Sequence, residues 1–209
     1  MDMWLQRLVV RGPLAELTRF RKVAESSSKP IYLTTTPEHC TQKLSFVRLA
    51  TLLPIDAPDQ RIAPEEPLDL LAERLKRHPD STVELSYGFQ FSRFEPDALI
   101  RAVSRRYPRS CFVLGMVAPS ADEQCSSFIQ NGKARCWCLP ESRKAKIVSR
   151  VPEENEDNCD EVDLALAEAD WAMMDEVVDH WKPTVDKFMS GEERRRSATP
   201  HVGKRRGDS

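Results

Sequence analysis

The clearest pattern of apolar and polar positions lies in residues 81–119. In the first part, STVELSYGFQF, apolar side chains occupy every second position: Val83, Leu85, Tyr87, Phe89 and Phe91. A period of two predicts a strand with one buried face. The next part, 95–108, has an apolar stripe at helical spacing, and 111–118 is almost wholly apolar, as in a strand covered on both sides. The stretch therefore predicts a strand, a helix and a second strand.

The same reasoning predicts further elements in the first 140 residues: a strand at 4–10, a helix at 14–24, an extended segment at 44–53, a helix at 68–77 and a hairpin at 128–139. Pro13 is expected as the first helical residue, and His78-Pro79 ends the helix at 68–77. The Asn131-Gly132 pair is the turn of the hairpin, because both central residues of such a turn need positive φ. Four prolines make 54–67 a connecting loop.

The charge pattern changes near residue 150. Residues 1–150 contain 23 Lys and Arg against 17 Asp and Glu, whereas residues 151–209 contain 8 against 16. Residues 153–179 contain twelve acids and no Lys or Arg. From residue 160 the apolar positions return at helical spacing, so the sequence predicts an acidic amphipathic helix at 160–182, interrupted or kinked by Pro183. Residues 191–209 are polar and are expected to be disordered.

The order of elements predicts an α+β fold, with two strand–helix units around an antiparallel sheet of the ferredoxin-like kind and helices on one face. The expected organisation is a domain at 1–150, an acidic linker and helix at 151–190, and a tail at 191–209. The segments at 7–20, 44–54, 86–114 and 128–132 resemble the ferredoxin-like domain of the Api-type proteins, a domain of unknown function found on phages and mobile elements. The resemblance implies this fold and genetic setting, and it implies no chemistry.

Several classes of function receive little support. No apolar run approaches the roughly 18 residues of a membrane span, and the N-terminus lacks a signal-peptide pattern, so we expect a cytoplasmic protein. The six cysteines are scattered and are expected to be free thiols. Cys125, Cys136 and Cys138, with His39-Cys40, offer sulfur and nitrogen ligands, but no second close pair exists, and we predict no metal or cofactor. Neither a nucleophile elbow nor a phosphate-binding glycine loop is present, which favours a protein that is not an enzyme.

The acidic helix is the strongest candidate for binding. Its apolar stripe must be covered, either by its own domain or by another protein, and the sequence leaves both arrangements open. In the second case the anchors are Trp171, Met174, Val178 and Trp181, and the residues that set charge preference are Asp170, Asp175, Glu176 and Asp179. The leading hypothesis is a non-catalytic accessory protein of a phage or mobile element that binds a macromolecular partner, such as a host-defence component, through this helix. The sequence does not indicate an oligomeric state.

The alternative hypothesis is nucleic-acid binding. In this hypothesis Arg101, Arg105, Arg106 and Arg109, on the outer face of the helix at 95–108 and at its end, form a phosphate-facing patch together with Arg7 and Arg11. Tyr87, Phe89 and Phe91 could stack bases if they lay on an open sheet face. The same aromatic residues suit a buried core equally well.

Overall fold

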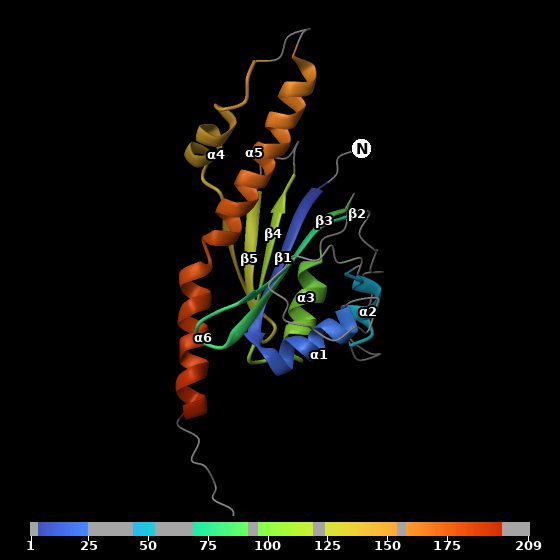
Figure 1. Ribbon diagram of the computed structural model, residues 1–209, viewed down its shortest axis with the longest axis vertical. Coiled ribbons are helices and arrows are strands. Elements are labelled where there is room, and N and C mark those ends of the chain that lie inside the picture. The colour runs from blue at the N-terminus through green and yellow to red at the C-terminus, as the bar shows by residue number, and fades with distance from the viewer. Residues whose placement is uncertain are drawn as a thin grey trace, which may run out of the picture.

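The computed structural model describes residues 4–24, 44–52, 69–91, 96–118, 124–153 and 158–197, and its fold is α+β (Figure 1). The elements in chain order are β1 (Trp4–Pro13), α1 (Leu14–Ala24), α2 (Phe46–Ala50), β2 (Asp69–Arg77), β3 (Thr82–Phe91), α3 (Asp97–Ser104), β4 (Cys111–Val117), β5 (Gln124–Gln130), β6 (Lys133–Cys138), α4 (Glu141–Val148), α5 (Cys159–Asp179) and α6 (Lys182–Ser197). None of the described helices is both long enough and apolar enough to cross a membrane.

The strands form one six-stranded sheet in the order β2-β3-β1-β4-β5-β6, and each neighbouring pair is antiparallel. β1 lies inside the sheet, where Leu8 pairs with Tyr87 on one side and with Leu114 on the other. The β5–β6 connection is the predicted Asn131-Gly132 turn, in which both residues have positive φ (46° and 77°). This turn confirms the predicted hairpin.

The main core lies between the sheet and α1, α2 and α3. Alternate residues of β1 and β3 point into this core, including Leu8, Val10 and Tyr87, and all three are fully buried. Phe20 of α1 packs edge-on against Tyr107 and Phe112, with ring centroids 5.6 Å away in each case. The predicted strand at 81–91, the helix within 95–108 and the strand at 111–118 are confirmed.

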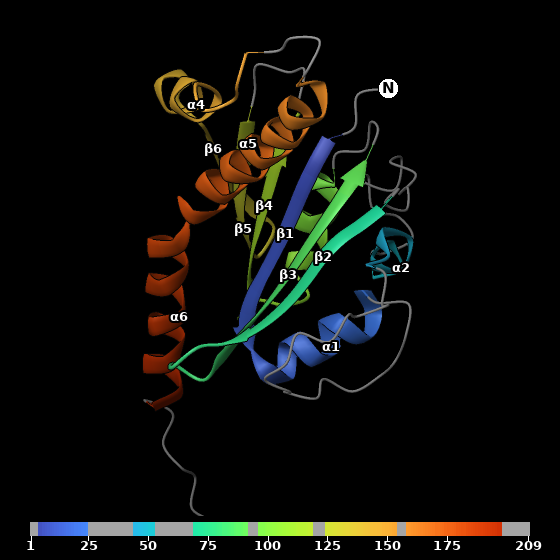
Figure 2. The same cartoon turned by 45° about the horizontal axis from the view of Figure 1, so that its top comes forward.

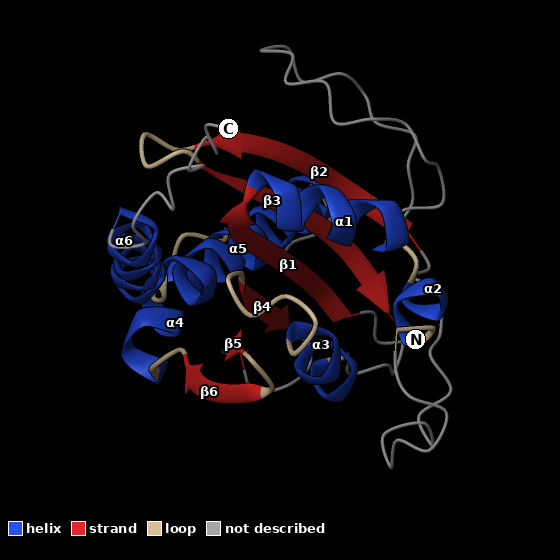
Figure 3. Cartoon of the chain, turned by 90° about the horizontal axis from the view of Figure 1, so that it is seen from below, coloured by secondary structure: helices blue, strands red, loops and turns tan. Residues whose placement is uncertain are grey.

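The opposite face of the sheet is covered by α5 and α6, with α4 packed against α5. Viewed from below, α2 and α3 lie on one side of the sheet, and α4 and α6 lie on the other (Figure 3). The predicted arrangement of helices on one face holds for α1, α2 and α3, whereas α4, α5 and α6 lie on the other face. Of the two arrangements left open for the acidic helix, docking onto its own domain is the one observed, because the sheet presents a second apolar face around Val117 and Val113.

Two elements differ from their predicted type. Residues 69–77 form strand β2 instead of a helix, because β3 supplies a pairing edge and the His78–Ser81 turn returns the chain along it. Residues 46–50 form helix α2 instead of an extended segment, and the Ser45 hydroxyl accepts a hydrogen bond from the Arg48 N–H, which caps its first turn. The predicted loop at 54–67 lies outside the described residues.

Smaller differences concern element ends. Pro13 is the last residue of β1 instead of the first residue of α1. The predicted acidic helix is observed as α5, and the chain bends at His180-Trp181 before α6. α6 extends to Ser197, so the start of the predicted disordered tail is helical, and residues 198–209 lie outside the described residues.

The prediction that all cysteines are free thiols is wrong for two of them. Cys125 and Cys138 form a disulfide that links β5 to β6. The two residues are directly opposite each other in the antiparallel register, which brings their Cα atoms to 4.0 Å. Among the other cysteines that the structure describes, Cys111 is buried, whereas Cys136 and Cys159 are exposed.

Candidate functional site

A groove of about 720 Å³ lies between the sheet and the helices α5 and α6. α5 packs mainly on β4, β1 and β5. Figure 2 shows α5 in front of β1, β4 and β5, with β2 and β3 beside it. Residues on the same face of β2 and β3 form part of the floor of the groove. The floor is formed by residues of four strands: Arg7, Val9, Arg11, Arg74, Lys76, Glu84, Ser86, Gly88, Cys111 and Val113. The helix wall is formed by residues of α5 and α6: Trp171, Asp175, Val178, Asp179, Lys182, Val185 and Asp186.

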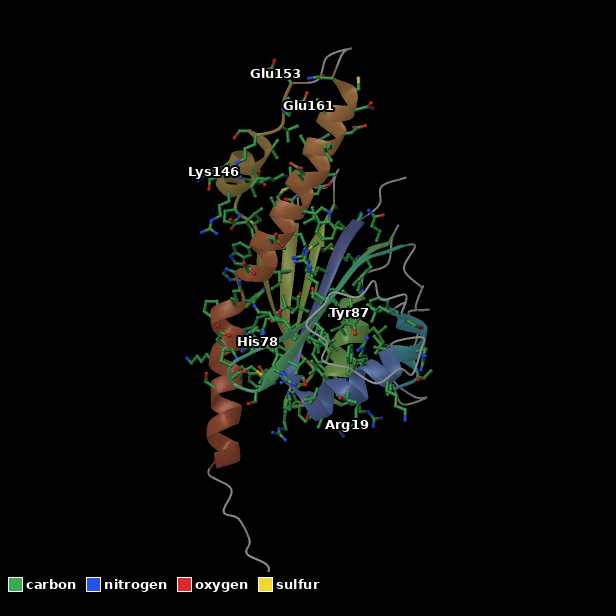
Figure 4. The ribbon with its side chains drawn as sticks, in the orientation of Figure 1. Arg19, His78, Tyr87, Lys146, Glu153 and Glu161 are labelled. Atoms are coloured by element: carbon green, nitrogen blue, oxygen red, sulfur yellow. A yellow bond between two sulfur atoms is a disulfide. The ribbon has the colours of Figure 1, made fainter. Side chains whose placement is uncertain are left out.

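Charges of opposite sign line the two sides of the groove. The strands contribute four of the five Lys and Arg residues, and the helices contribute three of the four acids. His78, at the end of β2, contacts the Glu84 carboxylate through Nε2 at 3.1 Å. Figure 4 shows His78 on the side of the sheet where α6 lies, and Tyr87 on the side of α1, α2 and α3. The exposed side chains of Arg74 and Lys76 make no ion pair with another described residue.

Arg11 joins three parts of the molecule at one end of the groove. Its Nε donates to Thr82 Oγ1 at 3.0 Å, one terminal nitrogen donates to Asp80 at 2.8 Å, and the other donates to Asp186 of α6 at 2.5 Å. The Arg11 side chain is only 6% exposed. All three guanidinium nitrogens therefore have partners, and Arg11 links β1 to the β2–β3 turn and to α6.

Arg7 has a more open environment on the same strand. One of its terminal nitrogens contacts the carboxylate of Asp175, and its guanidinium carbon lies over the Trp171 ring, 5.1 Å from the centroid. The Arg7 side chain is 18% exposed and that of Asp175 is 65% exposed. This ion pair is thus accessible from the groove.

The predicted partner-binding residues separate into two groups. Trp171, Val178, Asp175 and Asp179 line the groove. Asp170 is half-buried, and burial raises the pKa of its carboxyl group. Exposed Glu176 lies outside the groove lining and accepts a hydrogen bond from Arg143 at 3.0 Å.

Met174 and Trp181 do not face solvent, so their predicted role as partner anchors is corrected. Met174 is fully buried against the sheet. Trp181 is 6% exposed, and its indole N–H donates to Ser126 Oγ at 2.8 Å. The guanidinium of Arg135 covers the Trp181 ring at 5.6 Å. These side chains contribute to the protein's own core in this conformation.

The predicted nucleic-acid patch does not extend to Arg7 and Arg11. Arg101, Arg105 and Arg106 are exposed on α3 and the turn after it, but Arg7 and Arg11 lie on the opposite face of the sheet. The adjacent aromatic side chains cannot stack bases, because Tyr87 and Phe89 are fully buried, and the side chain of Phe91 lies outside the described residues.

The groove residues Arg74, Lys76, His78 and Ser86 were not predicted as a site. They were missed because 68–77 had the spacing of a helix, so its side chains had no expected relation to the strand at 81–91. The available signal was His78-Pro79-Asp80-Ser81, a run of turn-forming residues between two short apolar segments.

Reactive groups are sparse in the part of the chain that the structure describes. No three His, Cys, Asp or Glu side chains there are grouped so that they could hold a metal ion. Cys111 lines the groove, but burial raises the pKa of its thiol to about 12, so it stays protonated at neutral pH. Burial and the nearby charge of Arg143 lower the pKa of His180, whose ring stacks on Trp137 with centroids 4.0 Å apart.

Comparison of the chain with protein-family models, with curated proteins and with solved structures finds no match in any of the three. The fold and the groove are therefore the basis for inferring a function.

Acid should weaken the Arg11 network through Asp80. Burial alone would raise the pKa of Asp80, but hydrogen bonds from Thr82 and the charge of Arg11 outweigh it and hold this pKa below 3.8. A lowered folded-state pKa gives stability that is complete well above 3.8 and is lost as the pH falls through the folded-state value. We therefore expect the difference in unfolding free energy between the wild type and Asp80→Asn to shrink as the pH falls from about 6 to about 3.

Urea denaturation across this pH range measures that difference. Asp163→Asn, on the exposed side of α5, is the control for general charge effects. A wild-type advantage over Asp80→Asn that stays constant down to pH 3 contradicts the prediction.

Proposed function

We propose that this protein is a non-catalytic binding protein that holds an extended segment of a macromolecular partner, most simply another polypeptide, in the groove between β1–β3–β2 and α5–α6. The observation that carries the proposal is the groove itself, whose volume of about 720 Å³ falls in the range of ligand-binding clefts, roughly 300–1,000 Å³. The acidic helix then takes part through its polar edge and not through its apolar face.

The charges favour a polypeptide segment as the occupant. A segment with both acidic and basic side chains can place acids near the strand cations and bases near the helix carboxylates. Half-buried Trp171 and Val178 add apolar surface between the two charged sides. The setting in a phage or mobile element, and the relation to the Api-type proteins, are part of the proposal and rest on the sequence resemblance.

We also propose that β1, α1, β2, β3, α3 and β4 form a ferredoxin-like unit extended by β5 and β6. The support is the antiparallel order β2-β3-β1-β4, with α1 and α3 packed on one face. Cytoplasmic location is likewise a proposal, and the Cys125–Cys138 disulfide weighs against the free-thiol argument for it, because such bonds are typical of oxidising compartments.

A second candidate function is binding of single-stranded nucleic acid in the same groove. The specific observation in its favour is that Arg74 and Lys76 are exposed on the open floor. Four acids in the groove lining oppose it, since a polyanion would lie close to Glu84, Asp179 and Asp186. A polypeptide is therefore the better-supported occupant.

The groove is tested by filling it. Ser86 lies on the floor and is half-buried, so Ser86→Trp should place an indole in the groove and reduce capture of the native partner at least about tenfold, as expected when a central contact region is blocked. Thr18→Trp on the exposed face of α1 is the matched control and should capture the partner like the wild type.

The measurement is affinity purification from a host that carries the gene, after thermal unfolding has established that both variants are folded. Equal capture by Ser86→Trp and the wild type contradicts the proposal. Treating the extract with nuclease separates the two candidates, because a nucleic-acid partner is lost and a protein partner is retained.

A further inference from the structure

We propose that Arg7 is an anion-binding subsite of the groove, and that Asp175 occupies this subsite in the free protein until a carboxylate or phosphate group of the partner polypeptide takes its place. This inference rests on the proposed function, because it assigns a chemical group to the segment that the groove binds. It also identifies Arg7 as the residue that recognises this group.

A comparison between the two arginines of β1 supports the assignment. Arg11 has a partner for each of its three nitrogens, and its side chain is 6% exposed. Arg7 is three times as exposed, and among the described residues it makes one ion pair, from one terminal nitrogen to one oxygen of Asp175. A guanidinium has five N–H donors and binds oxyanions best through two of them at once. Arg7 therefore retains donors for a second or a replacement oxyanion.

Asp175 has the properties of a replaceable partner. Its side chain is 65% exposed, so the carboxylate can return to water at little cost when another anion binds Arg7. Trp171 remains under the guanidinium during this exchange, and cation–π contact keeps the Arg7 side chain in position. Asp186 is the helix acid that pairs with Arg11. In contrast to Arg7, Arg11 also donates to Asp80 and Thr82.

The remaining acids of the groove limit the class of ligand. Asp179 is paired with Lys182 at 3.0 Å, Glu84 lies beside His78, and Asp186 is bound to Arg11. A continuous polyanion would meet all three. A polypeptide with one acidic or phosphorylated side chain can place that group at Arg7 and keep it away from the three acids. We therefore assign the anion to a polypeptide.

The test uses small anions with the full chain: N-acetylglutamate for the carboxylate arm and N-acetylphosphoserine for the phosphate arm. Binding is followed by NMR at the Trp171 indole N–H and the Arg7 Nε–H. Asp175→Asn should bind at least one probe about fivefold more tightly than the wild type, the ratio expected for loss of a competing exposed ion pair. Arg7→Gln should abolish the saturable shift of the Trp171 signal.

Glu176→Gln is the matched control, because it makes the same change in charge at the adjacent residue, which lies outside the groove lining. It should bind the probes like the wild type. Equal gains in Asp175→Asn and Glu176→Gln, shifts that survive Arg7→Gln, or no binding by any variant each overturn the subsite. None of these results contradicts binding of a partner in the groove. That proposal is tested separately by the Ser86→Trp capture experiment, which uses no anion probe.

Discussion

Replacing Arg11 with methionine is expected to lower the unfolding free energy by about 3 kcal/mol, the low end of the range for breaking a buried ion pair. The guanidinium donates to Thr82, Asp80 and Asp186. Without it, the Asp80 carboxylate, whose side chain is 19% exposed, loses its cation while remaining partly shielded from water. Asp186 is 60% exposed and returns to water, which keeps the loss from being larger.

The measurement is urea denaturation at pH 7 followed by circular dichroism. Arg101→Met is the control, since Arg101 is exposed and its only described ion pair, with Asp97 at 3.7 Å, is of the surface type. That change should cost less than about 0.5 kcal/mol. Similar losses for the two variants would show that Arg11 does not act as the link between the sheet and α6.

The second large effect is expected at Gly115 of β4. At this glycine, side chains of α5 pack directly against the backbone of the sheet. A Cβ at this position would lie 2.7 Å from Met174 Sδ and 2.8 Å from Val178 Cγ2. Gly115→Val should therefore destabilise the protein by about 2–3 kcal/mol, as expected for overpacking. It should also lift α5 and expose Met174 and Trp181.

Hydrogen exchange of α5 and α6 and the fluorescence of the tryptophans measure this displacement. Gly191→Ala in α6 is the control, because nothing lies within 4 Å of its added Cβ, and the change should stabilise by about 0.5–1 kcal/mol. If exchange in α5 is unaltered by Gly115→Val, the close packing of α5 on β4 is not what holds the helix.

These two variants also separate the two ways in which the acidic helix could bind a partner. In the docked form, Trp171, Asp175 and Asp179 are available at the groove. In a displaced form, Met174 and Trp181 become available as well. A partner that binds Gly115→Val more tightly than the wild type would use the apolar face, and one that binds it more weakly would need the formed groove.

Parts of the candidate site could be predicted from sequence. Four of the eight residues assigned to partner binding line the groove, because helical periodicity places Trp171, Asp175, Val178 and Asp179 within one side of α5. Periodicity cannot decide whether that side of α5 is covered by the protein's own sheet or by a partner. The floor of the groove was not predicted, because it depends on β2 pairing with β3.

The Cys125–Cys138 disulfide could also have been predicted in part from the sequence. A two-residue Asn131-Gly132 turn pairs Gln130 with Lys133, and continuing that register places Cys125 opposite Cys138. The information was present locally, but the prediction began the first strand at residue 128 and so did not reach Cys125. Extending the strands along the register would have identified the bond.

By itself, the sequence determined the elements whose own side chains set their type: β1, α1, β3, α3, β4, the hairpin and the acidic helix. In these, periodicity, turn residues and helix-breaking residues all act within a few positions. The tertiary structure alone decided that 69–77 is a strand, that α5 covers the second face of the sheet, and that Arg7 and Arg11 meet acids about 170 residues away. Such contacts depend on which edges and faces remain uncovered after the local elements form, and local patterns carry no information about that.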